Sequence, residues 1–191
     1  MNSKEDVRVK KTRLALNQAF EELISTRHIE DISVNEICNQ ANVRRATFYK
    51  HYSDKYDFFS HYVGSLRIKY DSKPDTLSHI NSTVEYYVNY AKRIVEYIDE
   101  NSAMVSNLLG STQLHIIIGI IVQKNLSDTI EKLKTNVDRG MKLPTSIESC
   151  AAMLAGGIGT VIINWLMTNK ARSVEDLSND VAIFVRNILS T

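Results

Sequence analysis

Apolar residues recur at spacings of three and four along most of this chain, and this spacing limits the fold more than any other feature. Leu16, Ala19, Phe20 and Leu23 give one example. Such a stripe buries one side of an α-helix and does not fit the two-residue repeat of a β-strand. With only 2 prolines and 7 glycines in 191 residues, few positions favour turns. The sequence therefore predicts an all-α fold.

Two domains are expected, joined by a helix. Residues 1–53 are predicted to form a three-helix helix-turn-helix domain, 54–71 a connecting fourth helix, and 75–191 a helical domain. The stretch "DSKPD" precedes the second domain, and its Pro74 ends whatever helix comes before it. Further helices are expected at about 83–100, 104–109, 114–137, 147–168 and 174–189.

The composition points to an intracellular protein with a local anionic partner. Cys38 and Cys150 both lie within apolar helical patterns, which does not support a disulfide framework. The start, "MNSKEDVRVKKTR", is charged and has no apolar segment of a signal peptide. We therefore expect a cytoplasmic protein. The net charge is +1, but cations gather in the first third of the chain, near residues 8–13 and 44–55.

One stretch is long enough to cross a membrane. Residues 149–169 carry no charge, which is about the length of a bilayer span. The stretch also contains Thr160 and Asn164, and its large apolar residues form a stripe on one side. A helix facing lipid would be apolar all round. We favour a helix buried between protein helices, with a membrane helix as the alternative.

Residues 33–51 have the proportions of a helix-turn-helix. Ser33 and Glu36 predict a capping box at the start of the first short helix. Asn42 tolerates the left-handed conformation that a tight turn needs. We expect a second helix from Arg44 to about residue 51, with Phe48 buried against the first. The second helix of such a pair enters the major groove of DNA by its N-terminal end.

The chemistry of this second helix suits DNA. Arginine donates two hydrogen bonds to guanine, and Tyr49 carries a hydroxyl suited to a phosphate oxygen. An ordinary solvated helix end is the alternative interpretation of the same residues. The residues expected to contact DNA are Ser33, Arg44, Arg45, Ala46, Thr47, Tyr49, Lys50, His51 and Lys55.

The segment "ISVNEICNQANVRRATFYKHYSDKYDFF" resembles the DNA-binding signature of the TetR/AcrR family of bacterial transcriptional regulators. The resemblance covers about the first third of the chain. Asn42 and Ala46 stand where glycine is frequent in that family, and Arg44 where serine is frequent. Arg44 and Ala46 lie on the groove-facing end, so the operator sequence cannot be transferred from relatives.

The resemblance implies a homodimer that binds a palindromic operator in double-stranded DNA and pairs through its last two long helices. It also implies an unknown small-molecule effector in the C-terminal domain. We expect a repressor that the effector releases from its operator. The alternative is a TetR-like activator or adaptor whose C-terminal domain binds a protein partner. The residues suggested for the effector site are Tyr87, Tyr90, Met104, His115 and Trp165.

No pattern of catalytic residues accompanies these features. The chain lacks His-Glu-x-x-His, Cys-x-x-Cys and Gly-x-Ser-x-Gly. The "GGIG" run at 156–159 lies within a predicted helix, without the strand and Lys-Ser/Thr of a phosphate loop. We therefore expect no enzyme activity, no cofactor and no metal site. A helical enzyme with an unrecognised site is the remaining alternative.

Overall fold

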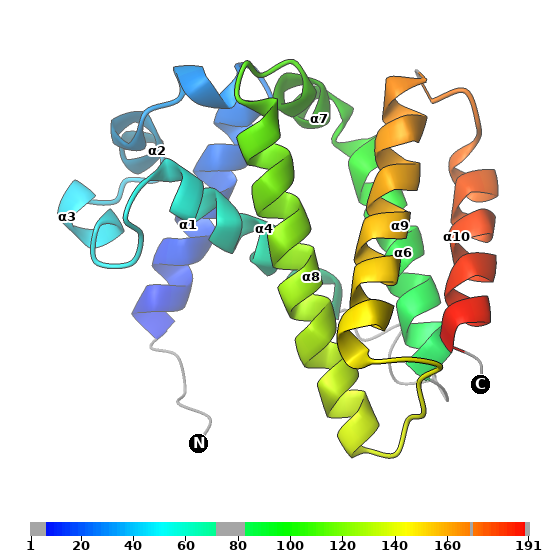
Figure 1. The fold of residues 1–191 in the computed structure, drawn as a ribbon. Helices are drawn as coiled ribbons and strands as arrows, with labels where there is room; N and C mark the ends of the chain where they lie inside the picture. Colours follow the sequence, from blue (N-terminus) through cyan, green and yellow to red (C-terminus); the bar gives the residue numbers. More distant parts are fainter. Residues whose placement is uncertain (1–6, 72–82, 169, 190–191) are drawn as a thin grey trace. The chain divides into compact units, whose positions relative to one another are not determined.

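A computed structural model describes residues 7–71, 83–168 and 170–189. Every regular element in these ranges is helical, which confirms the predicted all-α fold (Figure 1). Except for Asp71, the predicted linker at 71–75 lies outside the described residues. The elements are α1 (Val7–Ile24), the 3₁₀-helix η1 (Ile29–Asp31), α2 (Val34–Gln40), α3 (Arg45–Phe48), α4 (Lys55–Asp71), α6 (Thr83–Glu100), α7 (Ser102–Leu109), α8 (Leu114–Asp138), α9 (Ile147–Met167) and α10 (Val174–Leu189).

The chain divides into two compact units. One contains the N-terminal helices up to residue 62, here called the head, together with residues 101–120. The other contains the described residues of 63–100 and 121–191. Two of the three unit boundaries therefore fall within helices α4 and α8, and the third lies between α6 and α7. The expected division at 1–53 and 75–191 is contiguous in sequence, whereas residues 101–120 group with the head.

Aromatic side chains form the core of the head. Phe20 of α1 is fully buried, and its ring centroid lies 5.5 Å from that of Phe58 and 5.2 Å from that of Tyr62, both on α4. Ile29 at the start of η1 and Ile32 directly after it are both buried. This packing fixes α1 and η1 against the start of α4.

The turn between α2 and α3 is a helix-ending motif built on Asn42. Asn42 has φ 53°, and the backbone N–H of Val43 donates to the carbonyl of Cys38 at 2.8 Å. A left-handed residue followed by this long-range bond is the Schellman arrangement. The predicted left-handed turn at Asn42 is confirmed, and it sets the direction in which α3 leaves α2.

Replacing Asn42 with alanine is expected to destabilise the head by about 1 kcal/mol, because a Cβ is unfavourable at positive φ and alanine lacks the polar side chain that eases it. Urea denaturation measures this change. Asn42→Gly should keep or raise the stability, since glycine adopts this conformation freely. An Asn42→Ala protein as stable as the glycine variant would contradict this interpretation of the turn.

The second unit packs α6, α9 and α10 side by side (Figure 1), together with the later part of α8. Its largest cluster brings Tyr87 of α6, Leu133 of α8, Leu154 of α9 and Val185 of α10 together. A smaller cluster contains Val95, Ile162, Trp165 and Leu177. Apolar stripes of four helices, α6, α8, α9 and α10, thus contribute to the core of this unit.

Helix α9 meets the length and hydropathy expected of a membrane span, and it is the one unbent helix among the described residues that does so. Its Cys150, Leu154 and Trp165 side is buried in the two clusters of the second unit. Thr160 and Asn164 lie on its exposed side. One side of α9 is therefore packed against protein helices, as the buried-helix interpretation expects, while its exposed side also carries Met153, Val161 and Met167.

Candidate nucleic-acid interface

The second helix of the helix-turn-helix is shorter than the sequence predicted. Helix α3 spans Arg45–Phe48, and Arg44 is its N-cap residue with extended backbone (φ −67°, ψ 137°). Residues 49–51 form a turn and not a further helical turn. The expected helix from Arg44 to His51 is therefore wrong at both ends. The cause is local, since the backbone of Arg44 is extended and the N–H groups of His51 and Tyr52 both donate to the carbonyl of Phe48, which closes a turn there.

Phe48 anchors this short helix. Its side chain is fully buried, and its ring centroid lies 5.1 Å from that of Tyr52 and 5.7 Å from that of Phe58. Thr47 is half-buried beside it. The opposite side of the segment is exposed, and consists of Arg44, Arg45, Ala46, Tyr49, Lys50 and His51. We call these six residues the α3 edge.

The α3 edge is cationic and its charges are not neutralised locally. Within the described ranges, no carboxylate lies at ion-pair distance from Arg44, Arg45 or Lys50. The guanidinium of Arg45 lies 5.8 Å from the ring centroid of Tyr49, within the range of a cation–π contact. Tyr49 is 48% exposed. The edge therefore offers positive charge and an aromatic hydroxyl to an anionic partner.

Ser33 is the N-cap residue of α2. Its hydroxyl accepts the backbone N–H of Glu36 at 3.2 Å and donates to the Glu36 carboxylate at 2.7 Å. The carboxylate in turn accepts the backbone N–H of Ser33 at 2.9 Å, so the predicted capping box is confirmed. The other carboxylate oxygen of Glu36 accepts from Arg27 at 2.8 Å. Helix α2 is thus held at its N-terminal end by two residues of the preceding segment.

Lys55 is placed differently from what the sequence suggested. Its ammonium donates to the backbone carbonyls of Ile29, Glu30 and Ile32 at 2.8, 3.1 and 3.0 Å. Three acceptors use all three N–H donors of an ammonium. The expected phosphate contact by Lys55 therefore finds no support in this geometry.

Serine is a common N-cap, so the sequence alone would assign the cap of α4 to Ser53. The carboxylate of Asp54, one residue later than Ser53, accepts the backbone N–H groups of Tyr56 and Asp57 at 2.7 and 2.9 Å. Ser53 instead donates its backbone N–H and its hydroxyl to the Asp57 carboxylate. Serine and aspartate are comparable caps, and the adjacent pair allowed either assignment.

The acid stability of the head should depend on Glu30 and Glu36. Hydrogen bonds, chiefly from Ser111 to Glu30 and from the Ser33 backbone to Glu36, lower the pKa of each from 4.5 to about 2. The unfolded chain takes up these protons near pH 4.5, whereas the folded protein resists until about pH 2. Their stabilisation is complete above pH 4.5 and is lost as the pH falls toward 2.

We expect a Glu30→Gln, Glu36→Gln double variant to lose less unfolding free energy than the native sequence between about pH 5 and pH 3. Urea denaturation at several pH values measures this difference. Above pH 5 the variant should be the less stable protein, because it lacks the charged hydrogen bonds. Parallel pH profiles for the two proteins would show that these carboxylates do not titrate as described.

The five residues suggested for an effector site do not form one cluster. Met104 is buried in α7 beside the hydroxyl of Tyr62, and His115 is exposed on α8 within the same unit as the head. Tyr87 and Tyr90 lie on α6 in the second unit, and Tyr87 belongs to its larger cluster. Trp165 belongs to the smaller cluster and donates its indole N–H to the Arg172 carbonyl at 2.9 Å.

Comparisons with known protein families agree with the helix-turn-helix geometry of α2 and α3. Residues 18–62 match the family model of bacterial regulatory proteins of the tetR family, a range that includes α2 and α3. Residues 85–187 match a model of the C-terminal region of transcriptional regulators. The chain belongs to the TetR family of bacterial transcriptional regulators. TetR-family proteins are regulators and generally not enzymes. A search of curated protein sequences gave no significant match.

Solved structures of transcriptional regulators share the fold. A putative TetR-family regulator from Rhodococcus sp. superimposes with a TM-score of 0.66 at 14% identity, covering 94% of this chain and 99% of the other. FadR from Bacillus subtilis, solved with stearoyl-CoA, gives 0.59 at 20% identity and covers 90% and 96%. The dihydroxyacetone kinase operon activator DhaS gives 0.58 at 17% identity and covers 94% and 96%. At these identities the likeness concerns the fold.

Proposed function

We propose that this TetR-family protein is a cytoplasmic homodimer that binds a palindromic operator through the α3 edge and represses transcription. An effector bound in the C-terminal part of the chain releases the DNA. The observation that carries this proposal is the α3 edge itself. Arg44, Arg45 and Lys50 are exposed and lack carboxylate partners in the described chain, while Phe48 fixes the segment from behind.

Four residues of the edge are assigned a role by their chemistry. Arg45, the first residue of α3, suits a bidentate contact to guanine in the major groove. Arg44, Lys50 and Tyr49 suit phosphate oxygens, which fix the position of a protein on the duplex. Ser33 contributes by capping α2, and we leave Lys55 out of the contact set because its ammonium is fully used inside the head.

Selection of bound duplexes from random DNA tests this proposal. A dimer with two equal reading heads should recover an inverted repeat, with half-sites about one helical turn or a multiple of it apart. The Arg44→Ala, Arg45→Ala double variant serves as the control and should recover no shared sequence. Recovery of no repeat by the native protein would contradict the proposal.

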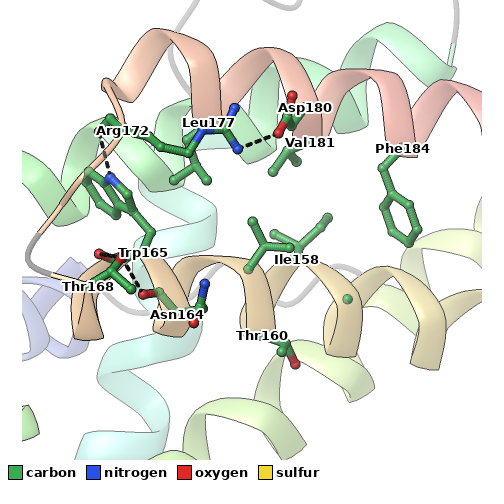
Figure 2. A pocket seen from close by; sticks show the side chains of 12 residues that line it. Ile158, Thr160, Asn164, Trp165, Thr168, Arg172, Leu177, Asp180, Val181 and Phe184 are labelled. Carbon is green, nitrogen blue, oxygen red and sulfur yellow. Dashed lines mark hydrogen bonds and ion pairs between the residues drawn. The ribbon is translucent and has the colours of Figure 1, made fainter.

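The dimer is proposed to form through α9 and α10. An apolar groove of about 440 Å³ is lined by both helices, and Val161 of α9 and Phe184 of α10 are among its lining residues. Figure 2 shows Ile158 of α9 and Phe184 of α10 in this groove. Val161 is 40% exposed and Phe184 38%. The Phe184 ring lies against Gly157, since an added Cβ there would come within 3.0 Å of the ring and the ring would have to shift. Two copies of such a face can form a four-helix bundle.

Phe184→Asp is expected to convert the dimer to a monomer at micromolar concentration, because it places a charge on the apolar face. Sedimentation velocity measures the change. The far-ultraviolet circular dichroism should stay unchanged, since Phe184 is partly exposed and leaves the cores intact. Lys134→Asp, on the exposed side of α8, is the matched control and should remain dimeric. A dimeric Phe184→Asp protein would place the interface elsewhere.

The effector and the sign of regulation are separate parts of the proposal. The stearoyl-CoA complex of the similarly folded FadR makes long-chain acyl-CoA the first class to test as an effector. An effector releases DNA only if it binds the DNA-free state more tightly. The operon activator DhaS supports an activator as the second candidate. A reporter gene behind the selected operator distinguishes them, because a repressor lowers its expression and an activator raises it.

A further inference from the structure

Residues 102–120, helix α7 with the first turns of α8, are here called the α7–α8 corner. The corner belongs to the same compact unit as the head, although about 40 residues separate it from the head in sequence. The hydroxyl of Tyr62 lies 3.6 Å from the sulfur of Met104, and Met104 is buried. This contact joins the corner to α4, and α7 also packs against α1.

A carboxylate joins the corner to η1. Glu30 accepts the hydroxyl of Ser111 at 2.6 Å, and the backbone N–H and hydroxyl of Thr112 at 2.8 and 2.9 Å. Ser111 is one of the few buried polar residues of the described chain. Hydrogen bonds to an ionised carboxylate are roughly twice as strong as neutral ones. Three of them converge on one side chain here.

Two further polar contacts fix the register of the corner. The Nδ1 of His28 donates to the carbonyl of Asn107 at 2.9 Å, and the side-chain amide of Asn107 donates to the carbonyl of Ile24 at 2.8 Å. Gly110 lies against the His28 ring, where an added Cβ would come within 2.8 Å of Cε1. These contacts together fix the position of the corner against the segment between α1 and η1.

The same η1 turn is tied to the helix-turn-helix on its other side. The ammonium of Lys55 holds the carbonyls of Ile29, Glu30 and Ile32. The next residue, Ser33, caps α2. A displacement of Glu30 therefore acts on three backbone groups that lead directly into α2.

We propose that Glu30 is a positioning residue that links the α7–α8 corner to the DNA-reading helices through η1. This inference rests on the proposed DNA binding by the α3 edge. When the corner is docked, Glu30 and Lys55 together hold η1 and the start of α2 in place. When the corner leaves Glu30, η1 loses that support. Because coupling is reciprocal, DNA bound to the head must stabilise the docked corner.

Hydrogen exchange measured by mass spectrometry, with and without the duplex recovered by selection, tests this link. In the native protein, DNA should slow exchange both in residues 34–51 and in residues 105–117, the latter at least about fivefold, the lower range of coupled sites. In Glu30→Ala the protection of 34–51 should persist, while that of 105–117 should fall below about twofold. Ser111→Ala with Thr112→Val should act in the same way from the other side of the contact.

Glu22→Ala is the matched control. Its carboxylate accepts from Gln40 at 2.6 Å and joins α1 to α2 inside the head, away from the corner. This variant should keep the effect of DNA on residues 105–117. Native-like protection of the corner in Glu30→Ala would overturn the role of Glu30. Absence of protection at 34–51 in the native protein would instead overturn the proposed DNA contact, so the two failures are distinguishable.

Discussion

Replacing Arg45 with alanine is expected to lower the affinity for the selected duplex about 100-fold or more, because the dimer loses one bidentate arginine–guanine contact in each subunit, at about 1–3 kcal/mol per contact. Arg45 is exposed at the first position of α3, and the Tyr49 ring lies 5.8 Å from its guanidinium. Within the described chain, no carboxylate forms an ion pair with the Arg45 guanidinium. Fluorescence anisotropy with a labelled duplex at fixed salt measures the loss.

Arg45→Lys separates base reading from charge. Lysine keeps the positive charge but lacks the planar fork of donors. This variant should therefore lose affinity for the selected duplex while keeping the affinity for a random duplex. Lys134→Ala removes an exposed cation of α8 and should change neither affinity by more than about twofold. If Arg45→Ala bound the selected duplex within twofold of the native protein, Arg45 would not contact the operator.

Replacing Phe20 with alanine is expected to destabilise the head by about 3 to 5 kcal/mol, the usual cost of removing a buried ring. Phe20 is fully buried and contacts the rings of Phe58, Phe59 and Tyr62. It therefore holds α1 against α4, and through α4 the η1 turn. Urea denaturation followed by circular dichroism measures the loss, and operator binding should fail at denaturant concentrations that the native protein tolerates.

Two variants control for this effect. Phe20→Leu keeps much of the buried volume and should lose less stability than Phe20→Ala. Tyr49→Ala truncates an aromatic ring of the α3 edge that is 48% exposed, and should change stability by no more than about 0.5 kcal/mol. A Phe20→Ala protein within about 1 kcal/mol of the native one would show that this aromatic cluster does not hold the head together.

Short-range features of the fold were predictable from the sequence because neighbouring residues determine them. The capping box of Ser33 and Glu36 is confirmed, as is the left-handed Asn42. The helix Val174–Leu189 has the predicted bounds. In each case the physical cause lies within a few residues, either a hydroxyl that reaches a nearby amide or an apolar stripe of fixed spacing.

Long-range polar contacts were not predictable in the same way. Lys55 had the appearance of a phosphate ligand, yet its ammonium binds three backbone carbonyls of residues 29–32. No sequence pattern indicated the contacts of Glu30, because its partners Ser111 and Thr112 are some 80 positions away and belong to no recognisable motif. Every residue has a backbone carbonyl, so the sequence does not show which carbonyls a side chain will bind. Such contacts become visible only when tertiary packing has brought the segments together.

The effector residues show a related limit. Aromatic residues and methionine line ligand sites, but they also fill helical cores. Tyr87, Met104 and Trp165 are each buried in packing contacts, and Met104 belongs to a different unit from the other two. Periodicity identifies the buried side of a helix. It does not tell which buried residues will share a cavity.

The salt dependence of operator binding tests the central claim most directly. If the cationic α3 edges of two subunits neutralise phosphates, the logarithm of the affinity should fall linearly with the logarithm of the salt concentration, with a slope near −0.9 per phosphate contact. Arg44→Ala should make this slope shallower by about two, one contact for each subunit. A flat dependence for the native protein, or the same slope for Arg44→Ala, would contradict the account.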